Sequence, residues 1–205
     1  MMMVLASKSP RRKEILDELM IDYEVLSEDV DESSDIDDPA ARCKAIASRK
    51  AGAVRDMLVS HNVDVNGLCI VGADTVVYCE GEFMGKPADR EDARRMLKAL
   101  SGKTHRVYTG ISVVIGGRTE SDVSVSEVDF AALDEEDIEA YLDTDEPYDK
   151  AGAYAVQGRA AMFIDEIRGD YLGIVGLSLR VLDKILRENF GRKLISMKKK
   201  EAPKK

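Results

Sequence analysis

Cysteine, histidine and tryptophan are scarce in this sequence of 205 residues, which has three cysteines, two histidines and no tryptophan. An odd number of cysteines without a CxxC pair argues against a disulfide framework and against a structural zinc site. We therefore expect reduced thiols. His61 and His105 stand in no Ser/His/Asp or Cys/His spacing, so we interpret both as structural or surface residues.

Long apolar runs are also missing. No stretch approaches the ~20 apolar residues of a membrane span. The apolar stretch at the N-terminus is far too short for a signal peptide, and its basic residues follow it instead of preceding it. We expect no membrane partner and a cytoplasmic location.

What the sequence does contain is typical of a globular protein. Hydrophobic residues make up 44% and charged residues 34%, with a net charge of -9. An acidic chain repels nucleic acid unless it carries a local basic patch. The one basic run is the lysine-rich segment 197–205, which has no periodicity and is expected to be disordered. We expect one domain over 1–196 and no nucleic-acid partner.

Strand and helix patterns alternate along the chain. Apolar runs predict strands, and helical spacing of apolar residues predicts helices. A hairpin around Gly116-Gly117 interrupts the alternation, which favours an α/β fold with a mixed sheet. A change of phase in the second hairpin strand predicts a bulge near Ser126. The strands are expected at 4–6, 23–26, 68–78, 107–115, 118–130 and 160–167, and the helices at 10–20, 39–58, 90–100, 134–142 and 178–190.

The segment 7–12, Ser-Lys-Ser-Pro-Arg-Arg, joins the first expected strand to the first expected helix. Free N–H groups at a helix N-terminus favour an anion, and arginine donates two parallel hydrogen bonds to phosphate. Arg11 and Arg12 could therefore hold phosphate beside Ser7. An ordinary N-cap with solvated arginines explains the pattern equally well.

Asp74 interrupts an otherwise apolar strand, and Thr75 follows it. Burying an isolated charge is costly unless the charge is paired or bound to a metal. A carboxylate at such a position suits a metal ligand or a general base. The alternative is a structural aspartate that accepts hydrogen bonds from backbone N–H groups.

Three weaker signals lie elsewhere. Asp31-Glu32 belongs to an acidic loop that is either solvated or a source of oxygen ligands for Mg²⁺. Lys86 in a Gly-Lys-Pro turn could reach a phosphate or be a surface residue. In the glycine-rich and alanine-rich stretch 149–158, Gln157 has the donor and acceptor that suit a nucleobase edge, although a tight packing corner would give the same stretch.

Taken in order, these segments resemble the Maf family of nucleotide pyrophosphatases, from Leu5 to about Leu186. The matching stretches are LASKSPRRKEIL, VGADTVV, GKP, MLKALSGKTHRVYTG, EPYDKAGAYAVQGRAAMFI, GDY and VGLSL.

The resemblance implies a fold similar to that of inosine triphosphate pyrophosphatases, an elongated mixed sheet with flanking helices and two lobes around a central cleft. It implies hydrolysis of a nucleoside triphosphate with a divalent cation, Mg²⁺ or Mn²⁺, and a possible homodimer. Asp74 is implied as the catalytic proton acceptor, and Glu32 with Asp74 as the metal site. The implied phosphate contacts are Ser7, Arg11, Arg12, Lys50 and Lys86, and the residues implied to select the substrate are Arg11, Thr75 and Gln157.

Within the family, the stretch DKAGAYAVQG is similar to the branch that acts on dTTP and UTP, and modified pyrimidine nucleotides are further candidate substrates. The alternative branch acts on 7-methyl-GTP. An alternative of another class is a non-catalytic nucleotide-binding regulator of cell division. The chain departs from the family pattern at Ser178, where proline is usual, and at Gly173, where asparagine is common.

Overall fold

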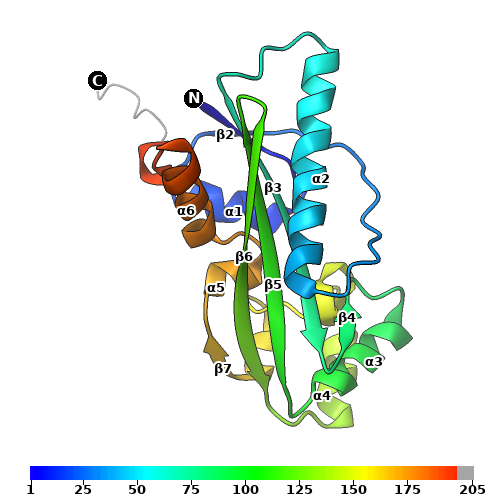
Figure 1. Ribbon diagram of the computed structural model, residues 1–205. Coiled ribbons are helices and arrows are strands. Elements are labelled where there is room, and N and C mark those ends of the chain that lie inside the picture. The colour runs from blue at the N-terminus through cyan, green and yellow to red at the C-terminus, as the bar shows by residue number, and fades with distance from the viewer. Residues whose placement is uncertain (198–205) are drawn as a thin grey trace, which may run out of the picture.

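The computed structural model describes residues 1–197, whose strands form one mixed sheet of seven strands (Figure 1). The order is β2-β1-β3-β5-β6-β7, with β4 paired to the far end of β3. β1 runs parallel to β2 and β3, and the other neighbours are antiparallel. The predicted mixed sheet is therefore confirmed. The strands are β1 Met2–Leu5, β2 Tyr23–Val25, β3 Leu68–Cys79, β4 Glu82–Met84, β5 Thr104–Ile115, β6 Arg118–Phe130 and β7 Ile164–Arg168.

Helices cover both faces of this sheet. The five predicted helices are present, and proline at the first position opens α1 and α2 as expected. The structure adds a short helix, α5, and several 3₁₀ turns. The helices are α1 Pro10–Glu18, α2 Pro39–Ser60, α3 Arg90–Leu100, α4 Glu135–Leu142, α5 Tyr171–Val175 and α6 Leu179–Phe190; the 3₁₀ turns are η1 Pro147–Asp149, η2 Ala151–Ala153, η3 Arg159–Phe163 and η4 Leu194–Ser196.

α2 packs unusually close to the strands beneath it. A Cβ on Gly72 of β3 would lie 2.2 Å from the carbonyl oxygen of Ala47, and one on Gly110 of β5 would lie 2.4 Å from the backbone of Cys43. Only glycine permits such an approach of helix to sheet. Gly110 pairs directly with Asp74, so the contact brings α2 down over that carboxylate.

The opposite face of the sheet holds the main hydrophobic core. Side chains of α1, α3, α4 and α6 pack there against β1, β3, β5 and β6. Its largest fully buried members include Leu16, Leu97, Ile111, Leu182 and Leu186. No helix within residues 1–197 is both long and apolar enough to cross a membrane.

The cysteines and histidines agree with the sequence interpretation. Cys43, Cys69 and Cys79 are free and buried, and burial raises the pKa of Cys43 and of Cys69 to about 12. Thiols with such a pKa stay protonated and are poor nucleophiles. His61 is exposed at the C-terminus of α2, whereas His105 is buried in the core.

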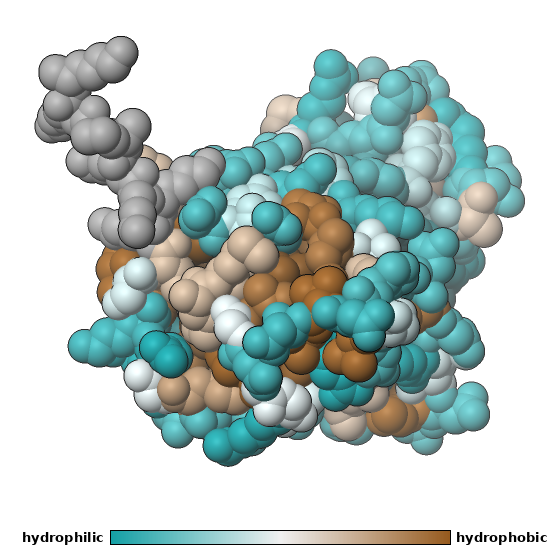
Figure 2. Space-filling view, turned by 90° about the horizontal axis from the view of Figure 1, so that it is seen from above, coloured by the Kyte–Doolittle hydropathy of each residue, from teal (hydrophilic) through white to brown (hydrophobic). Residues whose placement is uncertain are grey.

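The predicted extension of the first helix is wrong. α1 ends at Glu18, and Met20 has a positive φ of 52°, so the helical spacing stops before Leu19 and Met20. Both side chains are exposed instead of buried. Figure 2 shows that apolar residues are open to solvent on the face of the molecule seen from above.

The predicted bulge near Ser126 is also wrong. β5 and β6 pair without interruption from Thr104 opposite Asp129 to Ile115 opposite Arg118. The inward-facing positions of β6 include Ser124 and Ser126, while Val125 is exposed. The apparent change of phase arises because buried serines replace apolar residues, and the actual register shift lies between β6 and β7, at Asp129/Phe130.

Two boundaries need smaller corrections. The segment predicted as a strand over 160–167 begins as the 3₁₀ turn η3, and only Ile164–Arg168 is strand. Met197, assigned to the tail, belongs to the folded body because its carbonyl oxygen accepts a hydrogen bond from the N–H of Asp22 at 3.2 Å. The rest of the predicted tail lies outside the described residues, so its expected disorder stays a prediction.

Candidate functional site

The candidate site lies where one edge of β3 is left open. β1 accompanies β3 only as far as Val71, and β4 begins to pair at Val77. Between these pairings, residues 72–76 have β5 on one side and, within residues 1–197, no strand on the other. Side chains from both faces of the strand can therefore reach the same opening. This explains why Asp74 and Thr75, which alternate in direction, both line one cleft.

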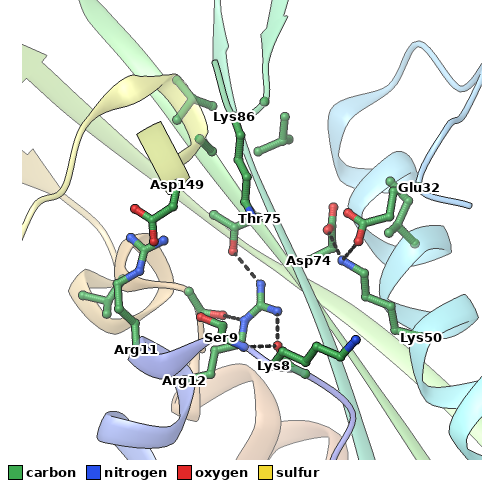
Figure 3. A pocket seen from close by; sticks show the side chains of 18 of the residues that line it. Lys8, Ser9, Arg11, Arg12, Glu32, Lys50, Asp74, Thr75, Lys86 and Asp149 are labelled. Atoms are coloured by element: carbon green, nitrogen blue, oxygen red, sulfur yellow. Dashed lines mark hydrogen bonds and ion pairs between the residues drawn. The ribbon is translucent and has the colours of Figure 1, made fainter. Parts of the chain in front are cut away.

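On the face covered by α2, Asp74 belongs to an ion-paired group. Lys50 Nζ lies 2.8 Å from Asp74 Oδ1 and 3.0 Å from Glu32 Oε1 (Figure 3). The side chains of Lys50 and Asp74 are 14% and 11% exposed, whereas that of Glu32 is 59% exposed. One ammonium group thus bridges a buried carboxylate and an accessible one.

The acidic loop that carries Glu32 is held against α2. Arg49 donates to the carbonyl oxygen of Asp31 and, at 3.0 Å, to that of Ser33, and Arg42 donates to that of Ser34. The Asp31 side chain turns back to the backbone N–H and hydroxyl of Ser33. Asp31 is thus used within the loop. Glu28, Asp29 and Glu32 line the cleft, and Glu32 is the one of these three that contacts Lys50.

On the opposite face, Arg12 is buried and held by neutral oxygens. Its guanidinium donates to the carbonyl oxygen of Gly176 at 2.8 Å, to Ser7 Oγ at 2.9 Å and to Thr75 Oγ1 at 3.4 Å. Burial lowers the pKa of Arg12, and the nearby charge of Asp74 acts in the opposite direction. Because arginine stays protonated even so, the cleft contains a fixed positive charge.

The N-terminus of α1 differs from those of α2, α3, α4 and α6. Side chains of Asp38, Asp89, Asp134 and Ser178 accept hydrogen bonds at the starts of α2, α3, α4 and α6. Ser9, at the start of α1, makes no such side-chain cap. The positive end of α1 therefore faces the cleft with backbone donors available to an anion.

A second group of charges faces the cleft from the other side. In Figure 3 the side chains of Arg11 and Asp149 point toward each other, and Lys86 extends into the cavity toward Thr75. Burial lowers the pKa of Arg11 below its ordinary value, and the nearby Asp149 carboxylate opposes that shift in part. Asp149 also lies within the electrostatic range of Lys86. The sequence interpretation missed Asp149, although it begins the stretch 149–158; an acidic residue beside Lys150 gave no signal of its own.

The cleft has a volume of about 830 Å³. It unites Ser7, Arg11, Arg12, Lys50 and Lys86 with Asp74, Thr75 and Glu32, so nearly all of the predicted site residues come together. Apolar side chains line part of the cleft as well: Val76, Val77, Val107, Tyr154, Val156, Ile174 and Val175.

Gln157 is the predicted residue that the structure does not bring into the cleft. Its side chain is exposed, and its neighbour Val156 lines the cleft in its place. A role for Gln157 in substrate selection therefore stays a prediction.

A buried polar network fixes the corner that holds Arg12. Asp170 caps α5 by accepting from Gly173 N at 3.1 Å, and its carboxylate also accepts from the hydroxyl of Ser178. Gly176 is the C-cap of α5, and its carbonyl oxygen is the acceptor for Arg12. The two departures from the family pattern fit this corner. Ser178 caps α6, and a Cβ at Gly173 would lie 2.8 Å from the hydroxyl oxygen of Ser124.

The donor set at Glu32 and Asp74 fits a hard divalent cation only in part. Within residues 1–197, no group of three or more His, Cys, Asp or Glu residues could hold a metal ion. Mg²⁺ is, however, commonly bound by one or two carboxylates together with substrate phosphates and water. Asp74 and Glu32 match that pattern, because both carboxylates already contact one positive group, the ammonium of Lys50, in a cleft lined by arginines and lysines.

Comparison with known proteins identifies the family of this chain. The family model described as Maf-like protein matches residues 2–189. A protein of Thermococcus onnurineus named dTTP/UTP pyrophosphatase is 42% identical, over 93% of this chain and 99% of its own. A protein of Aromatoleum aromaticum with the same name is 44% identical, over 91% and 94%. Among solved structures, the Staphylococcus aureus Ham1 protein matches with a TM-score of 0.47 and 15% identity, over 80% of this chain and 91% of that one. The family match and the two curated relatives, each covering nearly the whole chain, show that this protein belongs to the family of Maf-like proteins.

Proposed function

We propose that this protein hydrolyses dTTP and UTP to the nucleoside monophosphate and pyrophosphate. The names of the relatives support the substrate class. The observation that carries the proposal is the cleft that Arg11, Arg12, Lys50 and Lys86 line together with Asp74. In an acidic chain, such a concentration of cations suits a highly charged anion such as a triphosphate.

The triphosphate lies against the uncapped N-terminus of α1. Arg11, Arg12 and Lys50 contact its oxygens, with Lys86 reaching from the turn after β4 and Ser7 completing the set. Thr75 and Arg11 contribute to substrate selection, and the base packs against the apolar side chains that line the cleft. Arg12 is held in place before substrate arrives, so little reorganisation is needed.

Asp74 acts as the proton acceptor. A water molecule attacks the α-phosphorus, a bond forms from its oxygen to that phosphorus, and its proton passes to the Asp74 carboxylate. The bond between the α-phosphorus and the bridging oxygen breaks, and pyrophosphate leaves with the electron pair. Glu32 and Asp74 would hold a divalent cation, Mg²⁺ or Mn²⁺, whose chemistry is to offset phosphate charge.

The test is a panel of nucleoside triphosphates with the purified protein and Mg²⁺ or Mn²⁺. Released pyrophosphate is converted by inorganic pyrophosphatase and measured with malachite green. We expect kcat/KM for dTTP and UTP to exceed that for other bases by about tenfold or more, because a wrong base would leave the polar groups of Thr75 and Arg11 unpaired.

Two outcomes would replace this proposal. Fastest turnover of 7-methyl-GTP would move the protein to the other branch of the family. Nucleotide binding in a calorimetric titration without any release of pyrophosphate would indicate a non-catalytic regulator. A cytoplasmic location is part of the proposal and is supported by the three free cysteines.

A further inference from the structure

Lys50 occupies the position between the two carboxylates that are predicted to hold the metal. Its ammonium group contacts Asp74 at 2.8 Å and Glu32 at 3.0 Å, distances that make both contacts ion pairs. The lysine side chain is only 14% exposed, so it is seated in the cleft and does not extend into solvent. The contact also depends on the close packing of α2 over Gly72 and Gly110, which lowers the helix toward Asp74.

We propose that Lys50 is an internal counter-cation of the metal site. In the nucleotide-free protein it neutralises Asp74 and Glu32, and it leaves them for the phosphates when a divalent cation arrives with the nucleotide. This inference rests on the proposed function for the identity of the two ligands. It assigns to Lys50 a role in the empty protein that differs from a contact to phosphate.

Electrostatic repulsion prevents Lys50 from keeping its contacts with Asp74 and Glu32 while the same two carboxylates hold a divalent cation. A divalent cation held by the oxygens that Lys50 contacts would bring two positive charges within a few ångströms of the ammonium group, inside a cleft where screening is weak. Lysine has a flexible four-carbon stem, so its charge can move while α2 stays fixed. The triphosphate supplies a new partner for the displaced ammonium group. Metal and nucleotide should consequently each strengthen binding of the other.

The experiment is a calorimetric titration of Mn²⁺ alone into the nucleotide-free, full-length protein. Lys50→Met removes the charge and keeps most of the stem. We expect it to bind Mn²⁺ about tenfold or more tightly than the wild type, because no positive charge has to be displaced. Lys50→Arg retains the charge and should show no gain.

Lys8→Met is the matched control. Lys8 also lines the cleft and the substitution changes the net charge equally, but its partner is Asp29 at 3.1 Å. This variant should change Mn²⁺ affinity by less than about threefold, since its pair is exposed and well screened. Glu32→Gln and Asp74→Asn should each abolish the tight Mn²⁺ binding of Lys50→Met when combined with it.

Unchanged or weaker Mn²⁺ binding in Lys50→Met would overturn the role of Lys50, as would an equal gain in Lys8→Met. If Lys50→Met is too unstable for calorimetry, the rise of its Tm on addition of Mn²⁺ replaces the titration, and the rise must exceed that of the wild type. Hydrolysis of dTTP and UTP is measured separately. A gain in Mn²⁺ affinity without hydrolysis would refute only the proposed function, and hydrolysis without the gain would refute only the counter-cation.

Discussion

At the cleft, the two faces of β3 each carry a buried charge, and the two charges have different kinds of partner. On the α2 face, the carboxylate of Asp74 is paired with the ammonium group of Lys50, which also contacts Glu32. On the other face, the guanidinium of Arg12 is held by three neutral oxygens, those of Ser7, Thr75 and Gly176. An ion pair can be exchanged for another ion pair, whereas a buried guanidinium with several hydrogen bonds stays in place.

The comparison indicates a division of tasks between neighbouring residues. The face with Asp74 is suited to exchange of cations and to proton transfer, and the face with Thr75 is suited to holding a charge in a fixed position. Substitutions on the two faces should therefore have different kinds of effect, on turnover in the first case and on positioning and stability in the second.

The largest effect should come from Asp74→Asn. The substitution keeps the shape of the side chain but removes the proton acceptor, so kcat for dTTP should fall by about 10²–10⁴-fold. The fold should be retained, because an amide oxygen can still accept from Lys50. Steady-state kinetics together with circular dichroism checks both expectations, and a kcat close to that of the wild type would remove Asp74 from the proposed role.

A smaller loss is expected for Arg12→Lys on the opposite face. Lysine keeps the charge but lacks the planar fork that reaches Ser7, Thr75 and the Gly176 carbonyl at once. Misplacement of the charge should reduce kcat/KM by about 10²-fold. An unsatisfied buried acceptor should lower the free energy of unfolding by about 1–3 kcal/mol. Kinetics and urea unfolding measure the two quantities, and a variant that matched the wild type in both would show that the fixed geometry is unimportant.

A third prediction follows the Thr75 face along β5, away from the cleft, to His105. There Nε2 lies 2.8 Å from the hydroxyl of Tyr154, and Nδ1 has no hydrogen-bond partner in the described part of the chain. Burial lowers the pKa of His105 to about 4 from its ordinary value of 6.5.

Because the folded protein binds that proton less readily than the unfolded chain, the stability from neutral His105 is present above pH 6.5 and is lost as the pH falls toward 4. The free energy of unfolding should decrease by about 1.4 kcal/mol per pH unit from this group within that window. The double substitution His105→Phe with Tyr154→Phe removes both polar partners and should flatten the profile. Parallel profiles for wild type and variant, measured by urea unfolding, would contradict the assignment.

The smallest effect should come from Thr75→Val. It removes a hydroxyl that lies 3.4 Å from the Arg12 guanidinium and 3.0 Å from Thr109 Oγ1, with little change of shape. Because Arg12 keeps its other two partners, the free energy of unfolding should fall by only about 1 kcal/mol. KM for dTTP should rise more than kcat falls. Thr75→Ser keeps the hydroxyl and is the control; a Ser variant as impaired as the Val variant would show that the methyl group is what matters.

Much of the fold was predictable from local pattern. The helix over 90–100 was predicted with its exact bounds, since apolar spacing and an aspartate cap coincide there. The prediction failed where local pattern and tertiary contact disagree. Ser124 and Ser126 face inward on β6 because Asp170 and its loop offer them hydrogen bonds, and periodicity cannot show such a partner.

For the candidate site, the sequence predicted which residues take part, but it did not predict how they are arranged in space. The arginines after Ser7 and the carboxylate in an apolar strand each had a structural explanation as well as a functional one. Their order along the chain, together with the other segments, made the functional explanation specific. Asp149 and the carbonyl of Gly176 were missed because their importance comes only from what lies opposite them.

The sequence by itself determined the composition and the local elements of this protein: an acidic, cysteine-poor chain in which strands and helices alternate. It also showed the candidate charged residues, namely a single carboxylate in a buried strand and cations near helix starts and turns. The spacing of hydrophobic residues and the residue types at turns depend only on neighbours along the chain, so they can be recognised before the fold is known. Only the tertiary structure decided that β3 would be left open between β1 and β4, and that α2 would approach close enough for Lys50 to reach Asp74. Both depend on contacts between residues distant along the chain, whose packing no local pattern encodes.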